Sequence, residues 1–279
     1  MNAKTPADIT IPPRDLRFDL EAARKGHWLG DAVGTAVFNA LSITFPDGER
    51  LFIDAVKHYR TDLDGKLAED VRNFIAQEAI HSREHHTLNQ IIDRERYPVE
   101  RIEAAVKERT ALSRSRGPAG MLLSTIALEH FTAMMADEFA RSQDVFAHAD
   151  PEIERMWRWH AMEETEHKGV AYDVYLHAAR EWSPLKRYLR RTIAMALITV
   201  LFTRNITRYA AWLLEADGYT PKQALKAVRR YVWRQPGIFA RGWRTYFSWY
   251  RPGFHPWDHD NRALVEGWKA EFAAAAQAA

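Results

Sequence analysis

Two short segments rich in histidine and carboxylate residues constrain this chain more than any other feature. Each contains a Glu-x-x-His motif, formed by Glu78 and His81 in the first segment and by Glu164 and His167 in the second. Residues three apart share a face of an α-helix, so each pair presents a carboxylate and an imidazole to one point. Two such helices facing each other in a bundle contribute ligands to a dinuclear carboxylate metal site. We therefore expect an all-α protein with a buried metal centre.

A glutamate precedes each motif, in the order that such a site requires. Glu49 lies on a predicted helical face with Phe45 and Phe52, and Glu129 lies at the edge of an apolar stripe that includes Ile126. A carboxylate on a core-facing stripe is costly unless it is paired or bound to a metal. The pattern predicts six metal ligands: Glu49, Glu78, His81, Glu129, Glu164 and His167.

Mixed carboxylate and imidazole ligands suit divalent iron or manganese. We expect two iron ions, with manganese or a mixed pair as the alternative, and a third metal is not excluded. Buried, hydrogen-bonded polar residues without any metal are the competing interpretation. Glu163 is an alternative to Glu164, although the spacing to His167 favours Glu164.

Two further histidines lie on the same predicted helical faces as the ligands. His85 follows His81 by one helical turn, and His160 precedes Glu164 by one turn. They are candidate catalytic residues, acting as general bases, and they are equally candidates for extra ligands or for residues that orient the ligands. The alternative is that both are histidines at the edge of the core with backbone partners.

The helical periodicity divides the chain into three parts. Residues 1–30 are expected to form an extended arm, residues 31–182 a four-helix bundle, and residues 183–279 a basic, Trp-rich helical extension packed on the bundle. The four long helices are predicted from about Asp31, over Leu67 to Ile92, over Ala119 to Ser142, and from Asp150-Pro151 to about Glu181. Pro46 and Gly48 either kink the first helix or start a new one at Asp47.

Composition places limits on compartment and partners. The chain has 12 His but no Cys, which excludes disulfides and thiolate metal sites. The polar N-terminus argues against a signal peptide, so we expect a cytoplasmic protein. Residues 186–279 carry 16 basic and 6 acidic side chains, which favours peripheral contact with an anionic membrane surface or an acidic partner. The alternative is a solvated face that pairs with the acidic half of the chain. No nucleic-acid recognition motif is present, and Thr192 to Thr203 is too short to span a bilayer, so a buried core helix is expected there.

The sequence resembles the ferritin-like di-iron carboxylate proteins, and more closely a bacterial family labelled "predicted metal-dependent hydrolase". The resemblance rests on the segments 45–50, 77–85, 128–132, 159–168 and 251–260. It implies a four-helix ferritin-like core and a dinuclear site at the six residues named above. The additional His85 and His160 depart from the simplest six-ligand pattern.

Three functions follow as expectations. The first is a di-iron oxidase or oxygenase that uses dioxygen to oxidise an apolar or amphiphilic small molecule, for example a lipid. The second is a metal-dependent hydrolase, in which two ions activate a water molecule and His85 or His160 carries the proton. The third is a bundle that binds metal without catalysis.

Overall fold

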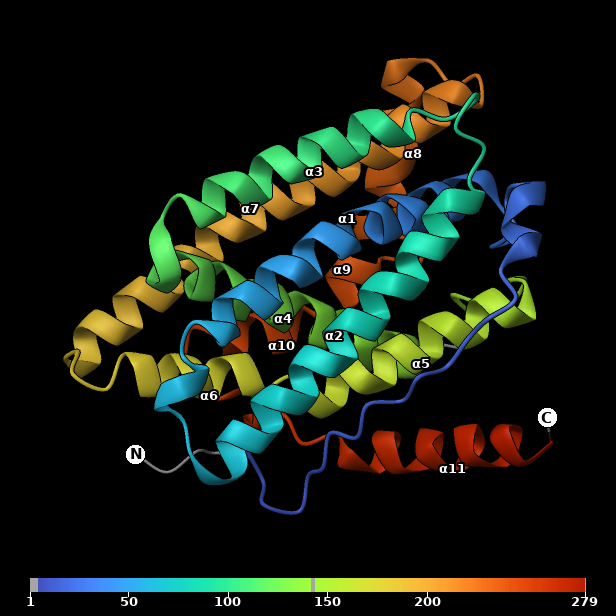
Figure 1. The fold of residues 1–279 in the computed structure, drawn as a ribbon. Coiled ribbons are helices and arrows are strands. Elements are labelled where there is room, and N and C mark those ends of the chain that lie inside the picture. Colours follow the sequence, from blue (N-terminus) through green and yellow to red (C-terminus); the bar gives the residue numbers. More distant parts are fainter. Residues whose placement is uncertain (1–4, 142–143, 279) are drawn as a thin grey trace.

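The computed structural model describes residues 5–141 and 144–278, and in these residues every regular element is a helix. The all-α prediction is therefore confirmed. Long helices surround a core and shorter ones close its ends (Figure 1). The α-helices are α1 Ala32–Lys57, α2 Gly65–Ile91, α3 Val99–Arg114, α4 Gly117–Arg141, α5 Pro151–His167, α6 Val170–Ala178, α7 Pro184–Ala216, α8 Pro221–Trp233, α9 Ile238–Arg241, α10 Trp243–Ser248 and α11 Arg262–Ala278. Three 3-10 turns, η1 Glu21–Lys25, η2 Arg60–Asp62 and η3 Pro256–Asp258, complete the set.

Four helices form the layer that carries the predicted ligands. α1 packs on α2, α4 packs on α5, and α1 also contacts α4. The expected start signal at Asp150-Pro151 is confirmed, because the Asp150 carboxylate accepts hydrogen bonds from the Glu152 and Ile153 amides and Pro151 occupies the first turn. The third predicted helix corresponds to α4, and its expected last residue, Ser142, lies outside the described residues.

α1 continues through Pro46 without starting again at Asp47. A proline has no amide hydrogen, so the carbonyl of Ser42, four residues earlier, loses its helical partner. The side-chain amide of Asn89 on α2 donates to that carbonyl at 3.0 Å. The side chain of Ser82, also on α2, donates to the carbonyl of Pro46 at 3.3 Å. α2 therefore supports α1 at the one place where its own ladder is incomplete.

The fourth predicted helix is not continuous, which corrects the expectation that it runs to about Glu181. α5 ends at His167 and α6 begins at Val170, with Lys168 and Gly169 between them. The Lys168 ammonium donates to the His259 carbonyl at 2.7 Å and to the Asn261 side chain at 2.6 Å. A Cβ at Gly169 would lie 2.6 Å from Thr5 Oγ1 and 2.8 Å from the Trp257 ring. The break therefore accommodates residues from both ends of the chain.

The C-terminal segment packs on the bundle through α7, which contacts α1 and α4. Met195, Phe202 and Ile206 of α7 are buried, whereas Ile193 and Val200 are 63% and 61% exposed. The expectation of a buried core helix over Thr192 to Thr203 is therefore wrong for one face of that helix. Residues 5–20 run as an extended arm across the bundle. The division into arm, bundle and extension as separate units stays a prediction.

Among the described residues, α4 is the one helix long and apolar enough to cross a membrane, and 67% of its most apolar window is buried inside the protein. That burial is typical of a core helix.

Candidate metal centre

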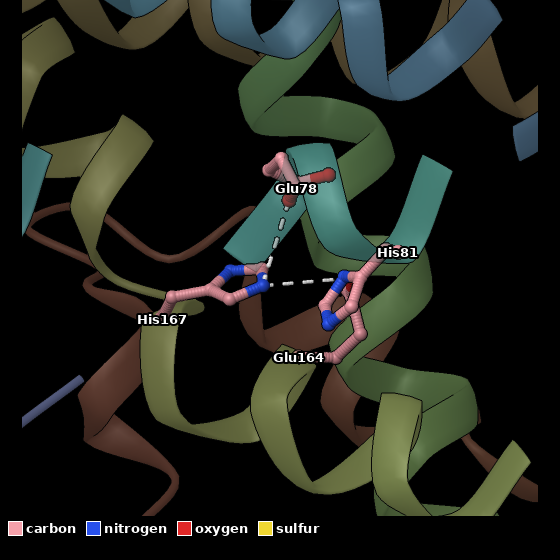
Figure 2. A group of neighbouring side chains, drawn as sticks. All are labelled: Glu78, His81, Glu164 and His167. Atoms are coloured by element: carbon pink, nitrogen blue, oxygen red, sulfur yellow. Dashed lines mark ion pairs between the residues drawn. The ribbon is translucent and has the colours of Figure 1, made fainter. Parts of the chain in front are cut away.

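The predicted ligands come together at one buried position between α1, α2, α4 and α5. Figure 2 shows Glu78 and His81 from α2 facing Glu164 and His167 from α5, and one ligand atom from each of these residues lies within 4.8 Å of the others. Glu49 of α1 forms a second such group with His81 and His160. Glu129 of α4 lies beside His167, with Oε2 3.2 Å from Nδ1. The helices therefore assemble ligands that are up to 118 positions apart (167 − 49) in the chain.

Many atoms at this position are buried without a hydrogen-bond partner. Both carboxylate oxygens of Glu49 and of Glu78 are in this state. The same holds for one oxygen each of Glu129 and Glu164, and for one ring nitrogen each of His81 and His167. Leaving one buried polar group unsatisfied costs roughly 1–3 kcal/mol, and more if it is charged. Divalent cations would satisfy these atoms together, so the donor set fits a dinuclear metal centre.

The electrostatics of the cluster are dominated by its carboxylates. Burial, reinforced by the neighbouring carboxylates, raises the pKa of Glu49 and of Glu78 well above the usual value. Burial and Glu164 raise the pKa of Glu129 to about 7. For Glu164, burial is outweighed by His167 and His160, which lower its pKa to about 2. Without bound cations, protons must therefore neutralise part of the negative charge of these carboxylates.

His81 is oriented by a layer of residues outside the cluster. Its Nε2 lies 2.9 Å from Glu163 Oε2, and Arg14 of the arm binds both Glu163, at 2.9 Å, and Glu166, at 2.8 Å. The Nδ1 atom of His81 is left without a partner and lies 3.7 Å from Glu164 Oε1. A histidine ligand is commonly held in this way by a carboxylate on its other nitrogen. Glu164 thus faces the cluster and Glu163 supports it, as the spacing to His167 indicated.

His167 is oriented in the same manner by Glu129. Its Nδ1 lies 3.2 Å from Glu129 Oε2, while its Nε2 points toward Glu78 Oε1 at 3.5 Å and Glu164 Oε1 at 3.6 Å. Burial lowers the pKa of His167, but Glu164 and Glu129 outweigh it and raise that pKa to about 9. The imidazolium is therefore the counter-charge of the carboxylates, and a cation would take over this role.

The protonation of His85 is set by a chain of hydrogen bonds that begins at Pro46. The side-chain NH2 group of Asn89 donates to the carbonyl of Ser42. The Oδ1 atom of Asn89 then accepts the hydroxyl hydrogen of Ser42 at 2.8 Å. The Ser42 oxygen must then accept from His85 Nδ1, which lies 2.9 Å away. Burial and the neighbouring His160 lower the pKa of His85 well below its usual value, so the ring is neutral. Its Nε2 is consequently a hydrogen-bond acceptor.

His160 completes the chain. Its Nδ1 lies 2.6 Å from His85 Nε2 and donates to it, and its Nε2 faces Glu164 Oε1 at 2.9 Å. Both nitrogens of His85 are occupied, so His85 is placed to orient His160. His160 Nε2 is the ring nitrogen that faces the cluster, where a cation could replace its hydrogen bond to Glu164. This arrangement favours His160 as a metal ligand beyond the six predicted ones, and His85 as a positioning residue.

Sequence reasoning missed the outer residues Arg14, Ser42 and Asn89. A signal existed for one of them: a proline inside a predicted helix leaves the carbonyl four residues earlier, that of Ser42, in need of a donor. No local pattern identifies Arg14, because the arm reaches Glu163 only through the tertiary fold.

The sequence matches the protein family described as "predicted metal-dependent hydrolase" over residues 12–260. The chain belongs to this family. No curated protein and no solved structure matches it significantly. The match includes every residue of the metal cluster, from Glu49 to His167.

Replacing one ligand should remove metal without unfolding the protein. We expect Glu129→Gln to lose at least one of two bound metal ions per chain, since an amide carries no charge to neutralise the cation. Elemental analysis of protein loaded with manganese and then desalted measures this. Glu138→Gln, on the same helix but outside the cluster, is the matched control and should retain both ions. Full metal content in Glu129→Gln would show that the ligand assignment is wrong.

The two additional histidines should behave differently from each other. His160→Ala should lose metal stoichiometry, because its Nε2 is directed at the cluster. His85→Ala should keep the stoichiometry and weaken metal affinity about 10–100-fold, the usual effect of losing a residue that orients a ligand. Competition with a metal chelator measures both quantities. Unchanged metal content and affinity in His160→Ala would contradict its role as a ligand.

Proposed function

We propose that the protein is an enzyme in which a dinuclear metal centre acts on an apolar or amphiphilic small molecule. The observation that carries this proposal is the convergence of unpartnered carboxylate and imidazole atoms at one buried position. The ligands would be the six residues predicted from the sequence, with His160 as a seventh. Two divalent ions held there would supply Lewis acidity and an activated water, or, as ferrous ions, electrons for dioxygen.

Hydrolysis is the reaction that we place first, which reverses the order favoured by the sequence alone. Its support is the family description together with a cluster whose ligands suit divalent cations. Within this reaction the chain's own residues have defined tasks. Glu49, whose carboxylate oxygens have no other partner, is available to hold a cation or the attacking water. The hydrogen bond between His85 and His160 fixes the orientation of the His160 ring, whose ligand atom lies near that of Glu49.

Dioxygen-dependent oxidation is the second candidate, and a specific observation favours it. The cluster is carboxylate-rich and is enclosed by apolar side chains, among them Phe45, Phe52, Leu128 and Phe202 around Glu49 and Glu164. An apolar enclosure excludes bulk water, which protects reactive species from side reactions. Iron is the metal that this candidate requires.

One pair of assays separates the two reactions. Protein loaded with manganese or ferrous iron under anaerobic conditions is given p-nitrophenyl octanoate, and the ferrous protein is separately exposed to dioxygen in an oxygen electrode. We expect metal-dependent ester cleavage without dioxygen, absent in Glu129→Gln and retained in Glu138→Gln. Stoichiometric uptake of dioxygen without ester cleavage would favour oxidation instead. Fully metal-loaded protein that performs neither reaction would contradict the enzymatic proposal.

A further inference from the structure

Two neighbouring, mainly apolar cavities lie beside the metal cluster, and we call the pair of them the passage. A cavity of about 120 Å³ lies between α1, α3, α4 and α7, and its wall includes Leu51, Ile198 and Ile206. A second cavity of about 40 Å³ is lined by Glu49, His160 and Glu164 of the cluster. The two cavities share four wall residues, Thr44, Gly48, Leu128 and Phe202. They are therefore neighbours along one path.

Gly48 marks the junction between the two cavities. It lies inside α1, where a glycine is less favourable than an alanine. A Cβ built on Gly48 would meet no atom within 4 Å. The helix therefore leaves open space at this point, on the turn that also carries Glu49. Because a Cβ here meets no protein atom, a larger side chain is expected to extend into the junction.

The outer end of the passage is cationic. Arg109 and Arg116 line the larger cavity, and no acidic residue does. Arg116 is exposed and Arg109 half-buried. Among the described residues neither guanidinium has an ion-pair partner, whereas Arg114, which lies between them in the sequence, pairs with Asp54 at 2.9 Å. Two unpaired guanidinium groups at the mouth of an apolar cavity match an anionic headgroup followed by an apolar chain.

We propose that this passage binds an amphiphile with an anionic headgroup, such as a carboxylate, at Arg109 and Arg116. Its apolar chain runs past Ile198 and Phe202 toward the metal cluster. The inference rests on the proposed function and names its substrate class. The bond that reacts then lies away from the anionic headgroup, at the end of the amphiphile that reaches the metal cluster; for hydrolysis it is an ester or amide bond at that end. An apolar cavity of roughly 150 Å³ holds a benzene-sized ligand, so the larger cavity suits a segment of a medium-length chain.

The binding test uses octanoate, measured by titration calorimetry on both the metal-free and the manganese-loaded protein. Gly48→Leu should weaken octanoate binding at least tenfold, because the new side chain fills the junction. Gly267→Leu is the matched control: it also lies in a helix, α11, with nothing within 4 Å of its Cβ, and should bind octanoate normally. Wild-type affinity in Gly48→Leu would overturn the proposal.

The headgroup is tested separately. The double variant Arg109→Gln/Arg116→Gln should lose at least tenfold in affinity for octanoate and keep its affinity for 1-octanol, and Lys107→Gln on the same helix should change neither. Equal octanoate affinity in the double variant and the wild type would refute the assigned headgroup site. Since binding is measured without turnover, a protein that binds octanoate but performs neither reaction refutes the proposed function alone.

A different observation supports a membrane-facing surface on α7, α8 and α10. On α7, Leu185, Leu189, Ile193, Leu197 and Val200 recur at helical spacing and are 41–66% exposed. Trp243 and Phe247 of α10 are 55% and 60% exposed. α10 lies beside the α7 stripe, because Tyr246 Oη is 2.9 Å from Thr199 Oγ1. These residues form one exposed apolar surface, which we call the α7 surface.

The α7 surface continues into a strongly basic groove between α7 and α8. Val200 and Trp233 lie at its edge, and among the described residues none of its cations has an ion-pair partner. The groove is lined by seven basic residues and one acidic residue: Arg204, Arg208, Lys222, Lys226, Arg229, Arg230 and Arg234, with Glu215. In a symmetric dimer these cations would oppose one another. Apolar and aromatic side chains beside unpaired cations instead complement an anionic lipid surface.

We infer that the α7 surface and the basic groove dock on an anionic phospholipid bilayer. The protein would lie on the bilayer and not cross it, because α7 does not qualify as a spanning helix. Each cation near such a surface adds to the attraction.

Vesicle co-sedimentation tests this inference. The protein should bind vesicles of phosphatidylcholine mixed with phosphatidylglycerol, and binding should fall as salt increases. Ile193→Asp/Val200→Asp should abolish binding, whereas Ala79→Asp, on an exposed position of α2, should not. Equal binding to pure phosphatidylcholine, or binding to duplex DNA with none to either vesicle, would overturn the inference.

Discussion

The structure depends on the burial of several like-charged carboxylates in one apolar core. Glu49, Glu78, Glu129 and Glu164 come from four helices and are each no more than 3% exposed. Unneutralised, such a group of charges would cost far more than the marginal stability of a typical domain, about 5–15 kcal/mol. Positive charge must therefore be supplied at the point where the helices meet. The raised pKa values of Glu49, Glu78 and His167 show the strength of this demand.

Residues outside the cluster hold the histidines of the site in defined orientations. On one side, Arg14 holds Glu163, and Glu163 holds His81. On the other side, the proline in α1 frees the Ser42 carbonyl, and Asn89, Ser42 and His85 then fix which nitrogen of His160 faces the cluster. The proline in α1 thus accounts both for the irregularity of that helix and for the orientation of the His160 ring. Precise placement of ligands by such second partners is what tunes a metal centre.

The sequence predicts those parts of the site that depend on local spacing. Glu78 with His81, and Glu164 with His167, are brought onto one face by the helical repeat alone, and Asp150-Pro151 specifies the start of α5 through its own hydrogen bonds. The features that depend on contacts between residues far apart in the chain were not predictable from the sequence. The break after His167 exists because Thr5 and Trp257, from opposite ends of the chain, approach Gly169. The exposed face of α7 was likewise not predicted, because the uncharged segment Thr192 to Thr203 favoured a buried core helix over an interfacial one.

The central claim is that the buried cluster binds two cations. Elemental analysis of wild-type protein, loaded anaerobically with ferrous iron or manganese and desalted, tests it most directly. The account predicts about two metal ions per chain, as in other bundles with paired Glu-x-x-His motifs. Protein that is folded, with the expected helical circular dichroism, and yet retains no stoichiometric metal would contradict it. In that case protons alone would neutralise the carboxylates, and the paired motifs would be structural.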